Sequence, residues 1–547
     1  MPFDDVVLSL QSAIDRLVRR LRLGPRPPRV ARRFLIVQID GLPRAVVEEA
    51  IATGCMPFVA RLLQRGGFRQ TPMNVGLPSS TPAFHMATMY GVRPDIPGFH
   101  YHDKRRHADI YFPRAGDAAH VEDTQAGGRR GILEGGSSYG CVFTGGAVNN
   151  LFNFAMIKRP SGTGLLRVLS VFVVLLWVVL KCVVLTTVEL VRAVARFLAD
   201  PVTETARGWK WLAIKVGLSV WVRQFFTLAV SSDLYRGVPA IYVNYLDYDV
   251  FAHAYGPRST RALRALRRVD ASIRQLWNVM RRVPEHEYEL YILSDHGQTL
   301  TTPYRTLNAG VRIERRLFDE FFDPRGTAPV TSTRAVGREL LAAVHQLRRQ
   351  RAHGIVQRFL NYLERDFLSW LGDVREAHER GGVRVVAAGP NAFVYFMYTV
   401  EPVRLEAIDE RWPGLVEDLS RSRGIGLVLA RTAGDPVCVW RGKRYAIGDL
   451  AEGPFASRPD VDLVAAGIRD LMAMRCAGDL VLYGHNSADG DVSFISELGA
   501  HAGPSAEEMQ TFVLHAAHVM LPAAITHPIQ LYDHFIGYRR PSHLEVA

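Results

Sequence analysis

Short, continuous apolar runs that end in acidic residues form the clearest pattern along this chain of 547 residues. Three runs have this form: residues 34–39 before Asp40, residues 240–246 before Asp247 and Asp249, and residues 290–293 before Ser294, Asp295 and His296. Helical patterns separate these runs, such as the one over residues 44–65. Apolar strands that alternate with helices predict an α/β fold with a doubly wound, mostly parallel sheet and helices on both faces. Ligands of such sheets bind where the strands end, so we expect the acidic residues to meet at one edge.

The chain also contains two longer apolar stretches, at residues 165–188 and 209–230. The first is long enough to cross a bilayer, but a single crossing would place Asp40 and Asp249 on opposite sides of the membrane. The second mixes tryptophans with basic residues, as interfacial helices do. We therefore predict an inserted apolar helical hairpin at residues 163–232 that dips into a membrane or lies on it. The alternative is a hairpin buried against the protein's own core or a partner subunit.

Composition divides the rest of the chain into further segments. Residues 1–33 read as a basic amphipathic segment with a Pro-rich breaker. We expect the catalytic α/β domain in three parts, at residues 34–162, 233–310 and 471–547. Between the last two, residues 311–470 form a mixed cap or insertion. Helical spacing is found at 333–380, and strand patterns are found at 383–400, 426–429 and 480–483.

The net charge and the cysteines indicate which partners and which kinds of site this protein is expected to have. The net charge of +12 favours an anionic partner, and nucleic acid, an acidic membrane surface and a phosphorylated substrate would all fit it. We predict no nucleic-acid partner. The five cysteines are scattered and include no close pair, which argues against a disulfide framework and a cysteine zinc site. The N-terminus lacks a signal-peptide pattern, so we expect a membrane-associated protein on the cytoplasmic face.

Carboxylates and histidines occur in an order that suits a pair of metal ions. Such ions bind carboxylate oxygens and imidazole nitrogens, and two of them can flank a phosphate. Asp249 and His253 are four residues apart, which places them on one face of a helical turn. Asp295 and His296 are adjacent, and His501 lies in a loop between glycines. Each signal is weak alone, and the prediction depends on all of them together.

A nucleophile is available in the segment Ser79-Ser80-Thr81-Pro82. A Ser/Thr run before a proline is also typical of a helix N-cap. Both interpretations can hold, because the start of a helix attracts a phosphate and favours an ionised oxygen. The residues themselves leave Ser80 and Thr81 open as nucleophiles, and leave Asp247 open as a rival of Asp249.

These motifs together resemble the nucleotide pyrophosphatase/phosphodiesterase branch of the alkaline phosphatase superfamily. The sequence has IDGLP, MPFVARLLQRGG and LPSSTPAFH in the family's order, followed by SDHG and GAHAGP. The resemblance implies one metal ion held by Asp40, Thr81, Asp295 and His296, and another held by Asp249, His253 and His501. It also implies that Thr81 attacks phosphorus to form a phosphothreonine intermediate. Two divalent metal ions are expected, zinc being usual in the family and manganese the alternative.

The resemblance implies phosphodiester or pyrophosphate cleavage on a phosphorylated small molecule, and the apolar hairpin adds a lipid-linked phosphate as a possible substrate. His102 stands where the family has a phosphate-binding asparagine, so we expect His102, Lys104 and Ser80 to contact the substrate. Three alternatives stay open: a phosphomonoesterase, a phosphoglycerate-mutase-like enzyme of the same superfamily, and a membrane-tethered pseudoenzyme that acts as a scaffold. A sulfatase is disfavoured, because residues 79–83 lack the cysteine and arginine of its motif.

Overall fold

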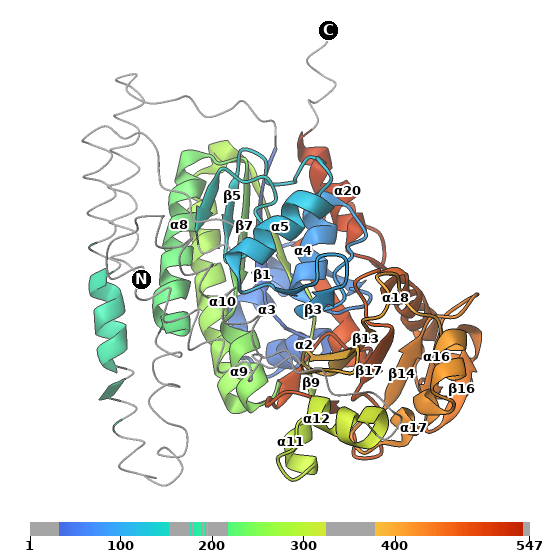
Figure 1. The fold of residues 1–547 in the computed structure, drawn as a ribbon. Coiled ribbons are helices and arrows are strands. Elements are labelled where there is room, and N and C mark those ends of the chain that lie inside the picture. Colours follow the sequence, from blue (N-terminus) through green and yellow to red (C-terminus); the bar gives the residue numbers. More distant parts are fainter. Residues whose placement is uncertain are drawn as a thin grey trace, which may run out of the picture.

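The computed structural model describes residues 32–151, part of 176–194, 217–323 and 378–539. The predicted basic segment therefore lies outside the described residues except for its last two positions. The helical pattern at 333–380 also lies outside them, apart from residues 378–380, which form strand β11. Figure 1 shows a central sheet with helices on both sides and a second, smaller unit beside it.

The central sheet has seven strands in the order β2-β20-β8-β1-β7-β5-β6. Their bounds are β1 (Arg33–Ile39), β2 (Phe68–Asn74), β5 (Ser137–Tyr139), β6 (Asn149–Leu151), β7 (Ala240–Tyr245), β8 (Tyr288–Leu293) and β20 (Gln510–Ala516). Strand β1 pairs in parallel with both β7 and β8, whereas β20 runs antiparallel to its two neighbours. The prediction of a doubly wound, mostly parallel α/β sheet is confirmed.

Side chains of β1 alternate between two cores, as expected for a strand that is covered on both faces. Phe34 and Ile36 pack with helices α4 (Thr81–Tyr90), α5 (Ala115–Gln125) and α20 (Ile529–Ile536). Leu35 and Val37 face the opposite layer. That layer contains α2 (Arg44–Ala52), α3 (Pro57–Arg65), α8 (Arg223–Arg236), α9 (Asp247–Tyr255) and α10 (Thr260–Met280).

The single helix predicted at 44–65 is wrong, since the structure has α2 and α3 in its place. Gly54 follows α2 with a φ of +73°, a left-handed conformation that ends a helix. Pro57 then begins α3, because a proline lacks the N–H that an interior helical position would need. The helical periodicity of the sequence continues across this break and hides it.

The second unit is an antiparallel sheet in the order β11-β12-β13-β17-β14-β15-β16. Its strands are β11 (His378–Arg380), β12 (Val383–Ala387), β13 (Asn391–Phe396), β14 (Leu427–Ala430), β15 (Val437–Trp440), β16 (Lys443–Ala446) and β17 (Leu480–Tyr483). The boundary predicted at 471 is therefore too early, because β17 pairs with β13 and β14 rather than with the central sheet. One face of this sheet shares a core with α4, so the two units are packed together.

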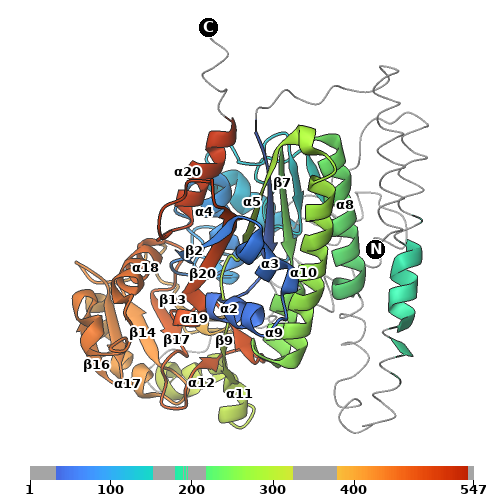
Figure 2. The same ribbon diagram turned by 180° about the vertical axis from the view of Figure 1, so that it is seen from behind.

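The predicted hairpin is described only in part. Helix α8, with the π-helical turn Gly217–Val222 before it, packs against α10 and buries Phe226 and Leu234. This second arm follows the alternative given for the hairpin, a segment buried against the protein's own core. The described residues between 176 and 194 are helical and lie on the outer side of α8 (Figures 1 and 2). Within the described part of the chain, no helix has the length and apolar character needed to span a bilayer.

Candidate metal centre

The ends of the central strands bring the predicted ligands together. Asp40 directly follows β1, Asp295 and His296 follow β8, and α9 begins two residues after β7. The register explains the meeting, because Ile39 pairs with Tyr245 and Gln38 pairs with Leu293. All three strands therefore end at the same level.

One cluster consists of Asp40, Asp295 and His296, whose ligand atoms all lie within 4.8 Å of one another. His296 Nε2 is 3.5 Å from Asp40 Oδ1 and 3.4 Å from Asp295 Oδ2. All three side chains are buried. The arrangement offers two carboxylates and one imidazole to a single point.

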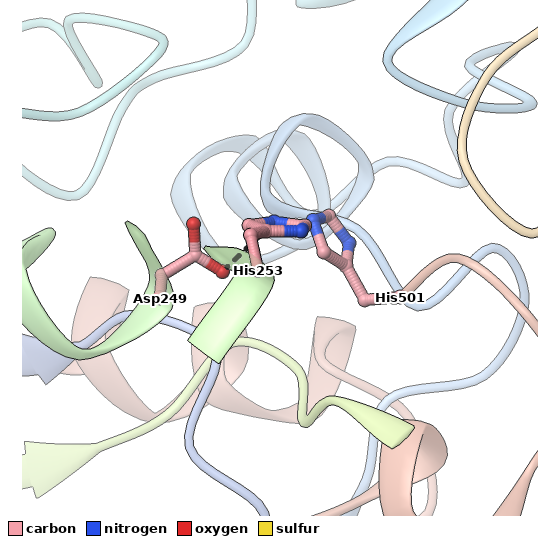
Figure 3. Close-up of side chains that lie close together, drawn as sticks. All are labelled: Asp249, His253 and His501. Carbon is pink, nitrogen blue, oxygen red and sulfur yellow. Dashed lines mark ion pairs between the residues drawn. The ribbon is translucent and has the colours of Figure 1, made fainter. Parts of the chain in front are cut away.

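A second cluster consists of Asp249, His253 and His501, again with ligand atoms within 4.8 Å of one another (Figure 3). Asp249 and His253 lie one turn apart on α9, and His253 Nε2 is 3.4 Å from Asp249 Oδ1. His501 follows the short strand β19 (Gly499–Ala500), and its ring stacks on that of His296 with centroids 3.8 Å apart. The two clusters are therefore adjacent.

Thr81 lies beside the first cluster at the start of α4. Its Oγ1 is 3.1 Å from His296 Nε2 and 3.5 Å from Asp40 Oδ1. Ser80 is the N-cap residue of the same helix, and its buried Oγ forms no hydrogen bond within the described residues. The geometry therefore favours Thr81 over Ser80 as the hydroxyl that contacts the ligands.

The electrostatics of the clusters suit cations. Burial raises the pKa of Asp40 well above its ordinary value, and the carboxylates of Asp295 and Asp249 raise it further. Burial also raises the pKa of Asp295. Asp295 Oδ2 is buried without a hydrogen bond, and no lysine or arginine of the described chain pairs with these three carboxylates. Concentrated negative charge and imidazole nitrogens fit a pair of divalent ions, zinc or manganese.

The structure separates Asp249 from its rival Asp247. Asp247 begins α9 and pairs with Arg223 Nε at 3.3 Å, with both side chains buried. Asp249 instead lies with His253 and His501. The i,i+4 spacing to His253 had favoured Asp249. The sequence could not predict the ion pair of Asp247, because its partner Arg223 lies in the apolar insertion.

His102 and Lys104 are placed differently from the ligands. His102 Nδ1 lies 2.8 Å from Asp109 Oδ1, and Lys104 Nζ lies 2.6 Å from Asp479 Oδ2. Lys104 thus ties the hairpin of β3 (His100–Asp103) and β4 (Ala108–Tyr111) to the second unit. Neither Asp109 nor Asp479 belongs to the two ligand clusters. The substrate contacts of His102 and Lys104 stay predictions.

Several residues that support the ligands were missed from the sequence. Asn244 Nδ2 donates to Asp40 Oδ2 at 2.6 Å, and Gln298 Nε2 donates to Asp249 Oδ1. Glu497 Oε2 lies 2.8 Å from His253 Nδ1. Asn244 is a polar residue inside an apolar run, and Gln298 directly follows SDHG, so both carried a signal. Glu497 carried none, because its contact is purely tertiary.

Comparisons with known proteins give a family match and two weaker structural similarities. The family described as type I phosphodiesterase / nucleotide pyrophosphatase matches residues 192–359, and this match confirms the resemblance seen in the sequence. No curated protein is significantly similar in sequence. Phosphonoacetate hydrolase from Sinorhizobium meliloti 1021, in complex with phosphonoformate, is 12% identical with a TM-score of 0.44 over 94% of this chain and 98% of that chain. Murine ectonucleotide pyrophosphatase / phosphodiesterase 5, in complex with AMP, is 9% identical with a TM-score of 0.43 over 93% and 94%.

Proposed function

We propose that this chain, which carries the type I phosphodiesterase / nucleotide pyrophosphatase match, cleaves phosphate diesters at two divalent metal ions with Thr81 as the nucleophile. The family match supports an activity on phosphoric ester bonds. One observation supports the finer proposal most: six acidic and imidazole side chains from separate segments meet beside one buried hydroxyl. Asp40, Asp295 and His296 would hold one ion, and Asp249, His253 and His501 would hold the other.

The proposed reaction has two displacement steps. Thr81 Oγ bonds to phosphorus as the bond to the leaving oxygen breaks, and that oxygen departs with a proton. Water then forms a bond to phosphorus, the bond to Thr81 breaks, and the hydroxyl regains its proton. Two divalent ions, when bound, stabilise charge on the phosphate and lower the pKa of the hydroxyl and the water.

The chain contributes position and polarity to these steps. Thr81 is the first residue of α4, a helix of ten residues whose start carries free N–H groups and partial positive charge. A phosphate held beside Thr81 would therefore face the favourable end of this helix. Asn244 restrains Asp40, which keeps that carboxylate at a fixed distance from the nucleophile.

Substitution of the two neighbouring hydroxyls tests the nucleophile. Thr81→Ala should lower turnover of bis-p-nitrophenyl phosphate by about 10³-fold or more. Ser80→Ala is the comparison variant, and as a substrate contact rather than the nucleophile it should lower turnover by only about 10-fold. Near-normal turnover in Thr81→Ala would end the assignment. Metal analysis of the wild type should find two ions per chain.

The choice of substrate separates the remaining alternatives. Turnover of p-nitrophenyl phosphate without turnover of the diester would favour the phosphomonoesterase alternative. A protein that binds two ions and cleaves neither compound would favour the pseudoenzyme.

We also propose that the chain contacts a membrane on its cytoplasmic face and acts on a lipid-linked phosphate. The described helical residues between 176 and 194 expose an apolar face, with side chains that are 40–63% exposed. These are Leu176, Leu180, Val183, Val184, Val188, Leu190, Val191 and Val194. An exposed apolar face of this extent is typical of an interaction surface. The net charge of +12 favours an anionic lipid surface as the partner.

The opposite side of this helix is attached to the protein. Cys182 is fully buried, Leu185 packs against the core, and Trp221 Nε1 donates to Thr186 Oγ1 at 3.0 Å. Among the described residues, this helix therefore has one face bound to the α8 region and an opposite face that is exposed.

Flotation with vesicles of phosphatidylcholine and phosphatidylserine tests the membrane proposal. The double variant Val184→Glu, Val191→Glu should stop floating, because charges in the contact face oppose insertion. Met520→Glu is the control, since Met520 is apolar, 83% exposed and outside this helix. A wild type that does not float would refute the proposal. A wild type that dimerises through this face instead would make it a subunit interface.

A further inference from the structure

We propose that Glu497 is a positioning residue that orients His253 for the second metal ion. This inference rests on the proposed function, because it assumes that Asp249, His253 and His501 hold an ion. Glu497 is part of neither ligand cluster, yet its carboxylate is buried directly behind one of the ligands.

The contact fixes which nitrogen of His253 is free. His253 Nδ1 lies 2.8 Å from Glu497 Oε2, while Nε2 points to Asp249, 3.4 Å from its Oδ1. A hydrogen on Nδ1 is donated to the carboxylate, which leaves the lone pair of Nε2 directed at the cluster. A carboxylate behind a histidine fixes the tautomer and raises the basicity of the imidazole toward a metal.

Glu497 is itself held firmly. Its other oxygen, Oε1, accepts a hydrogen bond from Ser493 Oγ at 2.7 Å. The next residue, Leu498, donates its backbone N–H to the carbonyl of His253 at 2.8 Å. The loop around Glu497 is therefore attached to α9 both at the imidazole and at the backbone of His253.

The same loop delivers the next ligand. His501 follows Glu497 by four residues, so one segment both orients His253 and supplies His501. The loop therefore has two functions in the proposed site: it orients one ligand and carries another. It couples the position of α9 to the position of His501.

A backbone carbonyl competes with Glu497 for the same hydrogen. Gly499 O also lies 2.8 Å from His253 Nδ1. If the carbonyl alone fixed the tautomer, removal of the carboxylate would leave metal binding unchanged. The experiment therefore has to measure metal affinity and not only turnover.

Zinc titration of metal-free protein against a competing chelator makes this measurement. In Glu497→Ala, one ion should bind as in the wild type and the other should bind about 10–100-fold more weakly. Glu497→Gln keeps the shape and one acceptor oxygen, so it should give an intermediate loss. It also serves if the alanine variant does not fold. Glu507→Ala is the control, because Glu507 is a nearby carboxylate that pairs with Arg258 at the surface.

Two results would overturn the inference. One is that Glu497→Ala binds both ions with wild-type affinity. The other is that both ions weaken together and the metal-free variant melts at a lower temperature, which would indicate a general structural role. A wild type that binds no zinc would instead refute the proposed function, so the two failures are distinguishable.

Discussion

Gly41 is a position where one added methyl group would act directly on the proposed metal centre. It follows Asp40 with a φ of +70°. A Cβ built at Gly41 would lie 2.5 Å from Asp249 Oδ1, 3.1 Å from Asp249 Cβ and 3.0 Å from Gln298 Nε2. We therefore expect Gly41→Ala to displace Asp249, although residue 41 binds no ion itself.

The expected effect has two parts. An alanine in the left-handed region costs about 1–2 kcal/mol. The contact with Asp249 adds a steric term, since non-bonded heavy atoms prefer separations about 1 Å longer than this. A metal–ligand distance can deviate from its ideal value by only about 0.2 Å. A shift of Asp249 by a large part of an ångström should therefore weaken the second ion by about 10-fold or more.

Gly54→Ala separates the two parts. Gly54 has nearly the same φ, +73°, but a Cβ added there would have no atom of the described residues within 4 Å apart from its chain neighbours. In the metal-free state Gly54→Ala should lose only the free energy of the backbone term, whereas Gly41→Ala should lose that free energy and the steric term as well. Only Gly41→Ala should lose affinity for one zinc ion in a chelator competition, together with diester turnover. Equal zinc binding in the two variants would refute the reasoning.

Three further predictions concern stability. Arg223→Met should lower the free energy of unfolding by about 3 kcal/mol or more, because Asp247 stays buried without its partner; an unchanged urea midpoint would contradict this. Burial raises the pKa of Glu508 to about 7. The free energy that its neutral carboxyl contributes to folding is therefore fully present below about pH 4.5 and is lost as the pH rises through about 7. The melting temperature of Glu508→Gln should accordingly rise relative to wild type between about pH 5 and pH 8, and a constant difference would argue against the shift. Metal removal should lower the melting temperature, because the carboxylates of Asp40, Asp249 and Asp295 then repel one another; an unchanged melting curve after chelation would show that no ion is bound there.

The proposed ligands at the strand ends could be predicted from the sequence because two local patterns coincide. Continuous apolar runs mark buried parallel strands, and the acidic residues come directly after them. In the structure β1 lies between β7 and β8, so Asp40 and Asp295 had to meet once the ladders formed. The helical spacing of Asp249 and His253 placed both on one face of α9. These ligands required no knowledge of distant contacts.

Other features depend on tertiary contacts that local patterns do not carry. The short apolar run Leu480–Tyr483 fits either sheet, and only pairing with β13 and β14 assigns it to the second unit. The second arm of the insertion looked interfacial because of its tryptophans and basic residues. In the structure Arg223 is neutralised by Asp247 and Phe226 faces the core, so α8 is a buried helix.

His501 shows how the parts of the site depend on one another. Its loop lies in the sequence between β17 of the second unit and β20 of the central sheet. Ser79, two residues before the proposed nucleophile, holds this loop. Its carbonyl oxygen lies 3.2 Å from His501 Nδ1, and its Oγ donates to Gly503 O and accepts from Ala502 N. The segment that positions Thr81 therefore also positions a ligand of the second cluster. The loop with His501 begins after β17, so its position also depends on where the second unit lies. The second unit is therefore part of the framework that brings His501 to Ser79.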